Sequence, residues 1–379
     1  MAPLKMKPFA KLPLFLFISL SSLLFSCEKE PDFEDSVTGV DLKANGKKLG
    51  KPLSAVNEVS SPATDTSAAV PFRENLGNYF RIAALEPEEC LPSELTSVLL
   101  GHLAELVSDP LAEDYFNLYT RLSSQLAVTD QSTQYFGGKG EYTNLVNRRI
   151  RELERFWDMS GQIRVNGQHS ESLDDREKLA SYYYSLLMDD ATWEMAYESA
   201  DAILALNAQS PHLPESLFFS LDGFLNFNKT IIIGDGLVQM LSETGIDPGL
   251  VYSAILAHEW AHQIQLDHFN SWFPGQDSYS PEQPTHILEL EADYFAAYFL
   301  THKRGATYNW KRVEEFLSLS FTLGDCSISS PTHHGTPNQR RRASQMGYEL
   351  AAAAQKKGHI LSPEEVHQAF LASLPKILN

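Results

Sequence analysis

The sequence predicts an α+β fold that is mostly helical, with one small sheet near the middle of the chain. Apolar residues recur at intervals of three and four in successive segments between residues 91 and 207, which is the spacing of amphipathic helices. Only two stretches, 163–165 and 225–233, have the β-branched and aromatic composition typical of strands. The chain has 379 residues, 43% of them hydrophobic, so it can bury a substantial core.

The N-terminus has the features of an export signal. Three lysines precede an apolar run over 12–25. This run is about 14 residues long, short of the roughly 20 that span a bilayer, so we predict a signal peptide over 1–26, with a short membrane anchor as the alternative. The Leu-Phe-Ser-Cys sequence at its end resembles the lipobox of bacterial lipoproteins. That resemblance implies lipidation of Cys27 and export to the periplasmic or cell-surface face of a bacterial membrane.

The charge of the chain argues against nucleic acid as a partner. The formal net charge is −19 at pH 7, and the first 26 residues carry three lysines and no acidic residue, so the exported chain is more acidic still. Such a surface repels phosphate backbones. Residues 27–85 are acidic at first and then rich in small and polar residues, which predicts a flexible tether.

Two cysteines remain once Cys27 is lipidated. An even count in an oxidising compartment is consistent with a disulfide between Cys90 and Cys326. Two buried free thiols are an equal alternative, because sequence gives no distance between them. Neither cysteine belongs to a Cys-x-x-Cys pair, so neither is a good zinc ligand candidate.

Residues 86–210 are predicted to be a helical region that serves as scaffold. Its apolar spacing predicts helices over 91–107, 111–127, 141–158, 174–188 and 190–207. The strand at 225–233 follows, with Lys229 interrupting its apolar face, and the Gly-Asp-Gly sequence at 234–236 ends it. A further helix is expected from 237 toward 243.

The segment after residue 246 predicts a buried helix that carries two metal ligands. The Asp-Pro pair at 247–248 is typical of an N-cap followed by the first helical position. The His-Glu-Trp-Ala-His sequence at 258–262 lies within this helix. Four residues advance a helix by about 400° and roughly 6 Å, so His258 and His262 project from one face. Glu259 lies about 100° round from the first histidine, within reach of a water on the metal, as a general base requires.

A second acidic motif supplies the third ligand. A helix is predicted over 285–302, and it contains Glu-Leu-Glu-Ala-Asp. Glu289 and Asp293 share a face by the four-residue rule, whereas Glu291 lies about 200° away and is expected to meet solvent. We therefore predict Glu289 as the third ligand. Asp293 can accept a hydrogen bond from a ligand imidazole and fix its tautomer.

These motifs resemble those of the gluzincin metallopeptidases, whose pattern is HExxH followed by a Glu-x-x-x-Asp helix. The resemblance is closest to the HtpX-like and CAAX-prenyl-protease-like branch and to bacterial neutral zinc metallopeptidases. It implies a zincin-like catalytic domain over 211–379 that binds one Zn²⁺, with 225–237 as a substrate-binding edge strand leading into a helix. It also implies that His334 stabilises the transition state and that Arg340 helps to order the site.

A metzincin-type site is the rival assignment. His268 lies ten residues after His258, which is the metzincin spacing for a third ligand, and Met346 lies in a sequence that resembles a Met-turn. That pattern needs glycine where this chain has Gln265, because the helix must turn sharply there. An uninterrupted helix would carry His268 about 15 Å along from His258. Met346 also lies in a stretch, 339–354, that is predicted to be a helix and not a turn. The gluzincin assignment is therefore preferred.

The predicted activity is that of a zinc-dependent endopeptidase acting on extracytoplasmic proteins or peptides. Glu259 would take a proton from water, and the substrate would pair with the edge strand through main-chain hydrogen bonds. Two other classes stay open: a lipid-anchored binding protein with a structural zinc site, and a metzincin-type or cell-wall amide hydrolase. A structural site has no use for Glu259 and usually closes the fourth position with a protein ligand.

Overall fold

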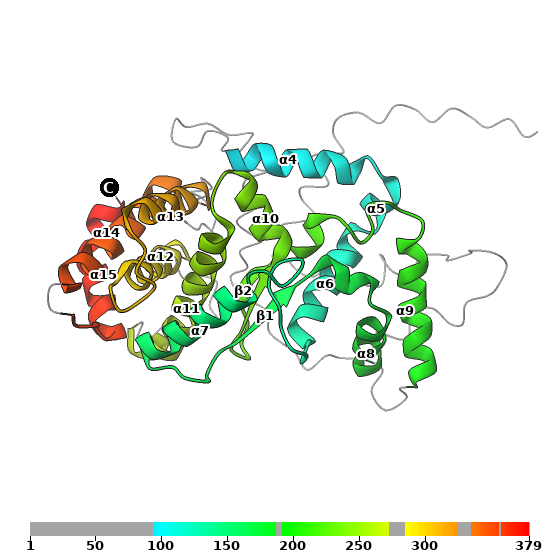
Figure 1. Cartoon of the computed structure of the whole chain (residues 1–379), viewed down its shortest axis with the longest axis horizontal. Helices are drawn as coiled ribbons and strands as arrows, with labels where there is room; N and C mark the ends of the chain where they lie inside the picture. The colour runs from blue at the N-terminus through cyan, green and yellow to red at the C-terminus, as the bar shows by residue number, and fades with distance from the viewer. Residues whose placement is uncertain (1–93, 187–191, 273–284, 324–334, 356–357, 379) are drawn as a thin grey trace, which may run out of the picture.

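The computed structural model describes residues 94–186, 192–272, 285–323, 335–355 and 358–378. They form a mostly helical α+β protein with one three-stranded sheet, as predicted. In Figure 1 the C-terminal helices lie to the left and the helices around α8 and α9 to the right, with the strands between them. Among the described residues, no helix has the length and apolar composition needed to cross a bilayer.

The helices before the sheet's central strand match the predicted helical segments. They are α4 (Glu94–Val107), α5 (Pro110–Asp114), α6 (Phe116–Thr129), α7 (Thr143–Trp157), α8 (Arg176–Leu186) and α9 (Trp193–Asn207). The predicted helix at 111–127 is divided between α5 and α6 at Tyr115. Helices α8 and α9 pack against each other as an antiparallel pair, since Arg176 pairs with Asp201 and Tyr184 stacks on Trp193.

The sheet joins strands from distant parts of the chain. Strand β1 (Arg164–Gln168) runs parallel to β3 (Thr230–Gly234), and β2 (Gly223–Leu225) runs antiparallel to β3 on its other side. The order is β1-β3-β2, so β3 is central and β2 is an edge strand. The sheet therefore connects the predicted helical region with the predicted catalytic region.

The single strand predicted over 225–233 is wrong, because the chain reverses within it. Residues between β2 and β3 form a tight turn, and Lys229 adopts a left-handed conformation with φ of 56°. The turn is closed by Asn226, whose side chain accepts a hydrogen bond from the Thr230 N–H at 3.0 Å. Lys229 breaks the apolar alternation because it belongs to this turn, and its ammonium pairs with Asp267 at 2.8 Å.

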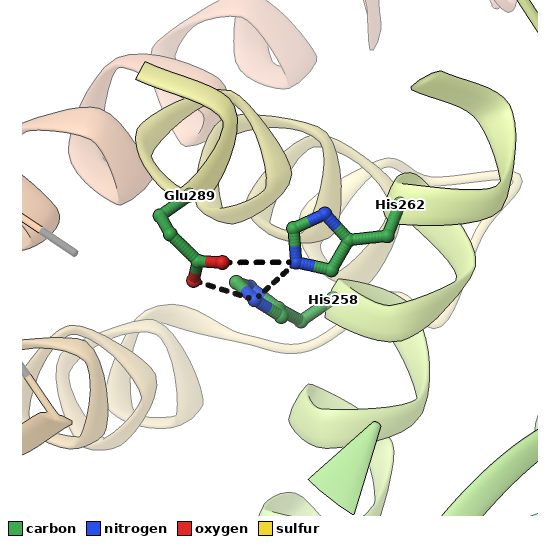
Figure 2. A group of neighbouring side chains, drawn as sticks. All are labelled: His258, His262 and Glu289. Carbon is green, nitrogen blue, oxygen red and sulfur yellow. Dashed lines mark hydrogen bonds and ion pairs between the residues drawn. The ribbon is translucent and has the colours of Figure 1, made fainter. Parts of the chain in front are cut away.

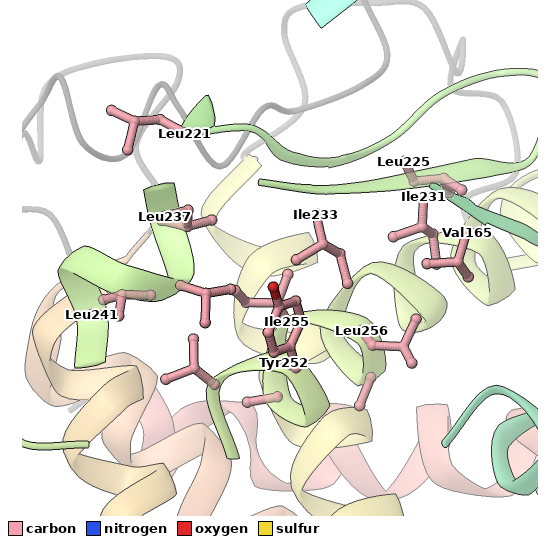
Figure 3. Packing of buried hydrophobic residues seen from close by; sticks show 14 of the residues in the cluster. Val165, Leu221, Leu225, Ile231, Ile233, Leu237, Leu241, Tyr252, Ile255 and Leu256 are labelled. Carbon is pink, nitrogen blue, oxygen red and sulfur yellow. The ribbon is translucent and has the colours of Figure 1, made fainter. Parts of the chain in front are cut away.

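One hydrophobic core extends through the described helices, and its part nearest the metal motif lies between the sheet and helices α10 (Asp235–Glu243) and α11 (Pro248–Trp272). Figure 3 shows apolar side chains of the strands, such as Ile231 and Ile233, facing Ile255 and Leu256 of α11. These four side chains are at most 2% exposed. Helix α11, which carries the His-Glu-Trp-Ala-His sequence, packs against both β3 and β2.

Four helices complete the fold. They are α12 (Thr285–Thr301), α13 (Trp310–Leu323), α14 (Pro337–Gln355) and α15 (Pro363–Leu378). Helix α12 packs on α11 and on α14, and α15 packs on α14 and α12. The sequence predicted α12 and α14, but not α13 or α15.

Candidate metal centre

Helix α11 places the two histidines. Its N-terminus is capped by Asp247, whose carboxylate accepts the Leu250 N–H at 2.9 Å, as the Asp-Pro sequence predicts. The helix is then regular over 25 residues. His258 and His262 therefore project from the same face, toward α12.

Helix α12 brings Glu289 to meet them. Its carboxylate oxygens lie 3.2 Å from Nε2 of His258 and 3.3 Å from Nε2 of His262, and the two Nε2 atoms lie 3.1 Å apart (Figure 2). All three residues are largely buried, and their ligand atoms lie within 4.8 Å of one another. Together they form a buried group that could hold a metal ion.

The imidazole of His258 is oriented by Asp293. Its Nδ1 lies 3.0 Å from one Asp293 oxygen, and Arg340 donates two hydrogen bonds to the same carboxylate at 2.6 and 2.7 Å. Burial acts to raise the pKa of Asp293, but the Arg340 charge and these hydrogen bonds outweigh it and lower the pKa. Asp293 is thus an acceptor, so Nδ1 of His258 is the donor and Nε2 keeps its lone pair for a metal.

Arg340 reaches Asp293 because helices α12 and α14 approach closely. A Cβ at Gly347 of α14 would lie 2.2 Å from the carbonyl oxygen of Tyr294 on α12. Only glycine permits this spacing. The arginine is 1% exposed, and its guanidinium also lies 3.8 Å from Glu289.

Glu259 is held beside the metal group by the edge strand. It is 2% exposed, and the backbone of Leu225 in β2 donates a hydrogen bond to its carboxylate. Its Oε2 atom has no hydrogen-bond partner among the described residues. Burial raises the pKa of Glu259 to about 8; Glu289 adds to this, while His262, the Leu225 hydrogen bond and Arg340 oppose it.

The electrostatics of the two histidines favour a cation between them. Burial lowers the pKa of each imidazole, but the surrounding carboxylates, Glu289 above all for His262 and Asp293 with Glu289 for His258, outweigh it and raise both values. Positive charge is therefore stabilised where the two Nε2 atoms meet. A tetrahedral ion with ligands at about 2.0–2.1 Å sets them about 3.3 Å apart, close to the three distances observed, so the residues present fit a metal ion.

The structure brings together most of the residues that the sequence singled out. His258, Glu259, His262, Glu289, Asp293 and Arg340 form one buried cluster. His334, Cys27, Cys90 and Cys326 lie outside the described residues. The rival ligand His268 is not in the cluster: α11 continues past it without a turn, and its ring stacks on Trp272 at 4.9 Å. Met346 lies within α14, in helix and not in a turn.

The prediction that Glu291 meets solvent is wrong. It is fully buried, with one carboxylate oxygen 3.0 Å from Nε2 of Gln265 and the other 2.6 Å from Nδ1 of His367. The helical period does not reveal this burial, because the partners of Glu291 lie on two other helices, α11 and α15. Gln265 also contacts His262. Sequence reasoning therefore missed three polar residues that adjoin the site: Gln265, Glu291 and His367. In the sequence, Gln265 carries no signal beyond the absence of a metzincin glycine.

Comparisons of this chain with protein-family models, with curated proteins and with solved structures gave no match.

Proposed function

We propose that this chain is a zinc-dependent endopeptidase with a zincin-like site of the gluzincin type. The observation that carries the proposal is the buried group of two imidazoles and one carboxylate, with Glu259 beside it. This donor set is typical of catalytic zinc sites, in which three protein ligands leave the fourth position open. Calcium and magnesium prefer all-oxygen sites, so two nitrogen ligands favour zinc or another late transition metal.

Zinc bound to these residues supplies a Lewis acid that acidifies water and polarises a peptide carbonyl. The chain's own residues supply the proton transfer and the geometry. Oε2 of Glu259 is the free carboxylate atom that takes a proton and later delivers it to the leaving amine, while Leu225 holds the other side of the carboxylate. The acidic side chain and its backbone anchor are thus arranged for general acid–base work.

The edge strand β2 offers a place for an extended peptide. Asp222 and Asn226 bond across to β3, through the Gly234 N–H at 2.7 Å and the Thr230 carbonyl at 2.9 Å. By the alternation of an antiparallel ladder, the backbone groups of Gly223 and Leu225 point away from β3. The Leu225 N–H is directed at Glu259, so both backbone groups of Gly223 and the carbonyl of Leu225 are the ones offered to a substrate. A substrate strand added there would lie beside Glu259 and bind through its main chain, which accommodates many side chains. We also propose that His334 donates a hydrogen bond to the negatively charged oxygen that develops on the substrate carbonyl in the transition state.

The proposal includes export of the enzyme. A lipid on Cys27 would hold it at a bacterial membrane, where its substrates would be extracytoplasmic proteins or peptides. The acidic composition of the exported chain fits a protein or peptide partner better than nucleic acid.

The test separates ligand from base. Glu289→Ala removes a ligand and is expected to abolish stoichiometric zinc binding, whereas the matched change His268→Ala is expected to keep it. Glu259→Gln is expected to keep zinc and fold but to lose at least roughly 10²–10⁴-fold in turnover of casein peptides. Zinc retained by Glu289→Ala, or normal turnover by Glu259→Gln, contradicts the proposal. Turnover of purified cell-wall peptides in place of casein would reassign the substrate.

A further inference from the structure

Gln265 is buried on α11, one turn after the second histidine of the metal group. It is 3% exposed, and its side-chain oxygen lies 2.8 Å from Nδ1 of His262. Its side-chain nitrogen lies 2.9 Å from the carbonyl oxygen of Leu288 and 3.0 Å from Glu291. All the polar atoms of this amide are therefore occupied.

These contacts fix the orientation of the amide. A main-chain carbonyl can only accept a hydrogen bond, so the atom facing Leu288 must be the NH₂ group of Gln265. The atom facing His262 is then the amide oxygen, which also can only accept. It follows that Nδ1 of His262 carries the hydrogen and Nε2 presents its lone pair to the metal group.

The amide is in turn held by the C-terminal helix. Glu291 of α12 accepts from Gln265 with one oxygen and lies 2.6 Å from Nδ1 of His367 on α15 with the other. The His367 ring stacks on Trp272, with centroids 4.1 Å apart and planes 3° apart, and Trp272 donates its indole N–H to Glu364 of α15 at 2.6 Å. His367 and Glu291 are at most 2% exposed, so the contact between them is shielded from solvent, whereas the bond from Trp272 to Glu364 lies at the surface.

We propose that Gln265 is a positioning residue for His262, and that His367 acts through it by way of Glu291. Asp293 and Arg340 position His258 in the same way: Asp293 contacts its imidazole, and Arg340 holds Asp293. The inference rests on the proposed metal site. It assigns to α15 a role in metal affinity, although no residue of α15 is a member of the metal group.

Zinc affinity tests the inference directly. Gln265→Met keeps the length of the side chain but removes the acceptor, and loss of such a partner is expected to weaken zinc binding roughly 10–100-fold. The matched control is Gln263→Met, a change of the same kind at a 2% exposed glutamine whose side chain bonds to Asp267. The control is expected to bind zinc as the unaltered protein does. Affinities are measured by competition with a chromophoric chelator.

Two further readouts distinguish positioning from general stability. Correlation spectra of the imidazole nitrogens in the zinc-loaded protein should show His262 protonated at Nδ1, and this signal should change in Gln265→Met but not in Gln263→Met. His367→Leu should weaken zinc binding less than Gln265→Met, and His367→Gln, which keeps a donor for Glu291, should recover part of the loss. The double variant Gln265→Met with His367→Leu should bind no more weakly than Gln265→Met alone, since the two act along one path.

The outcomes separate this inference from the proposed function. An unaltered protein that binds no zinc contradicts the metal site itself. If the unaltered protein and Gln265→Met bind zinc with equal affinity, the proposed role of Gln265 is overturned, while the metal site itself stands. Independent, additive losses in the double variant overturn the path from His367. Where His367→Leu does not fold, the Gln265 and Gln263 variants decide the question by themselves.

Discussion

Arg340 is a buried arginine whose guanidinium donates two hydrogen bonds to the Asp293 carboxylate. Its partner Asp293 is 3% exposed and also contacts His258, so this ion pair, together with the 3.8 Å approach of the guanidinium to Glu289, connects α14 to the metal group. A buried charge that loses its partner is strongly destabilising. The stability of the protein and the geometry of His258 should therefore respond together to a change at Arg340.

Arg340→Met is expected to lower the free energy of unfolding by roughly 3–5 kcal/mol, because it leaves the Asp293 carboxylate without a cation. The free energy of unfolding of Arg340→Lys should lie between those of the unaltered protein and Arg340→Met, since an ammonium keeps the charge but lacks the planar guanidinium. The neighbouring Arg341 is exposed, and Arg341→Met should change stability by less than about 0.5 kcal/mol. Urea unfolding measures all three. Equal midpoints for Arg340→Met and Arg341→Met would contradict the structural role.

Which residues of the site the sequence can predict depends on how they are related. His258, His262, Glu289 and Asp293 lie on two helices at intervals of four, so the helical period alone places each pair on one face. Gln265 meets Glu291 across two helices and His367 across a third, and no period within one helix specifies such contacts. The period separates Glu291 from Glu289 on α12, but it contains no information about Gln265 of α11 and His367 of α15, which contact its carboxylate.

The same limit applies to whole elements. Apart from α13 and α15, the helices are set by local spacing and lie within a few residues of their predicted bounds, whereas the β2–β3 reversal depends on a turn without glycine. The left-handed φ of Lys229 and the side-chain bond of Asn226 make that turn, and neither is a strong sequence signal. Apolar residues on both sides made one long strand the simpler interpretation. The structure shows two short strands instead, and this puts an edge beside Glu259.

Asp130 shows how one residue joins elements. It ends α6, and its carboxylate accepts the Ser132 N–H at 2.7 Å and the Lys178 ammonium of α8 at 3.0 Å. Its carbonyl oxygen accepts Arg164 and Asn166 of β1. Burial acts to raise the pKa of Asp130, but the bonds from Ser132 and Lys178 outweigh it and lower the pKa.

A depressed pKa gives a pH dependence of known sign. The ionised Asp130 contributes stability above its unfolded pKa of 3.8, and this contribution disappears as pH falls through the lower folded value. Asp130→Asn should therefore be less stable than the unaltered protein by about 1–2 kcal/mol near neutral pH, with a smaller difference at about pH 3. Urea midpoints at both pH values provide the measurement. A difference that is constant or larger in acid would show that the charge of Asp130 is not involved.

At the scale of the whole molecule, the proposed anchor is a single residue. Cys27→Ala should remove lipid labelling and release the protein from membranes into the soluble extracytoplasmic fraction, because the lipid would be the only attachment. Fractionation with labelled fatty acid gives the measurement, and Cys90→Ala is the matched control that should stay membrane-bound. Continued membrane association of the Cys27 variant would favour a retained N-terminal helix.

The core is continuous across the predicted boundary at residue 210. Strand β1 precedes the boundary and is the parallel partner of β3, which follows it. Helix α7 also packs on α11, and its Phe156 ring lies 5.2 Å from Phe299 of α12. The helical region therefore packs against α11 and α12, the two helices that carry the metal group.

This continuity predicts how fragments of the chain behave. A fragment of residues 211–379 contains every member of the metal group, but it lacks β1 and would expose the apolar faces that α7 covers. Since marginal stability is the difference of large terms, loss of a sheet partner and of these contacts should prevent cooperative folding. The fragment 86–379 should unfold in one thermal transition and bind zinc, and residues 86–210 added in trans should restore some zinc binding to 211–379. Circular dichroism melting and zinc titration measure both properties. A sharp transition with stoichiometric zinc in 211–379 alone would show that the catalytic region folds as an independent domain.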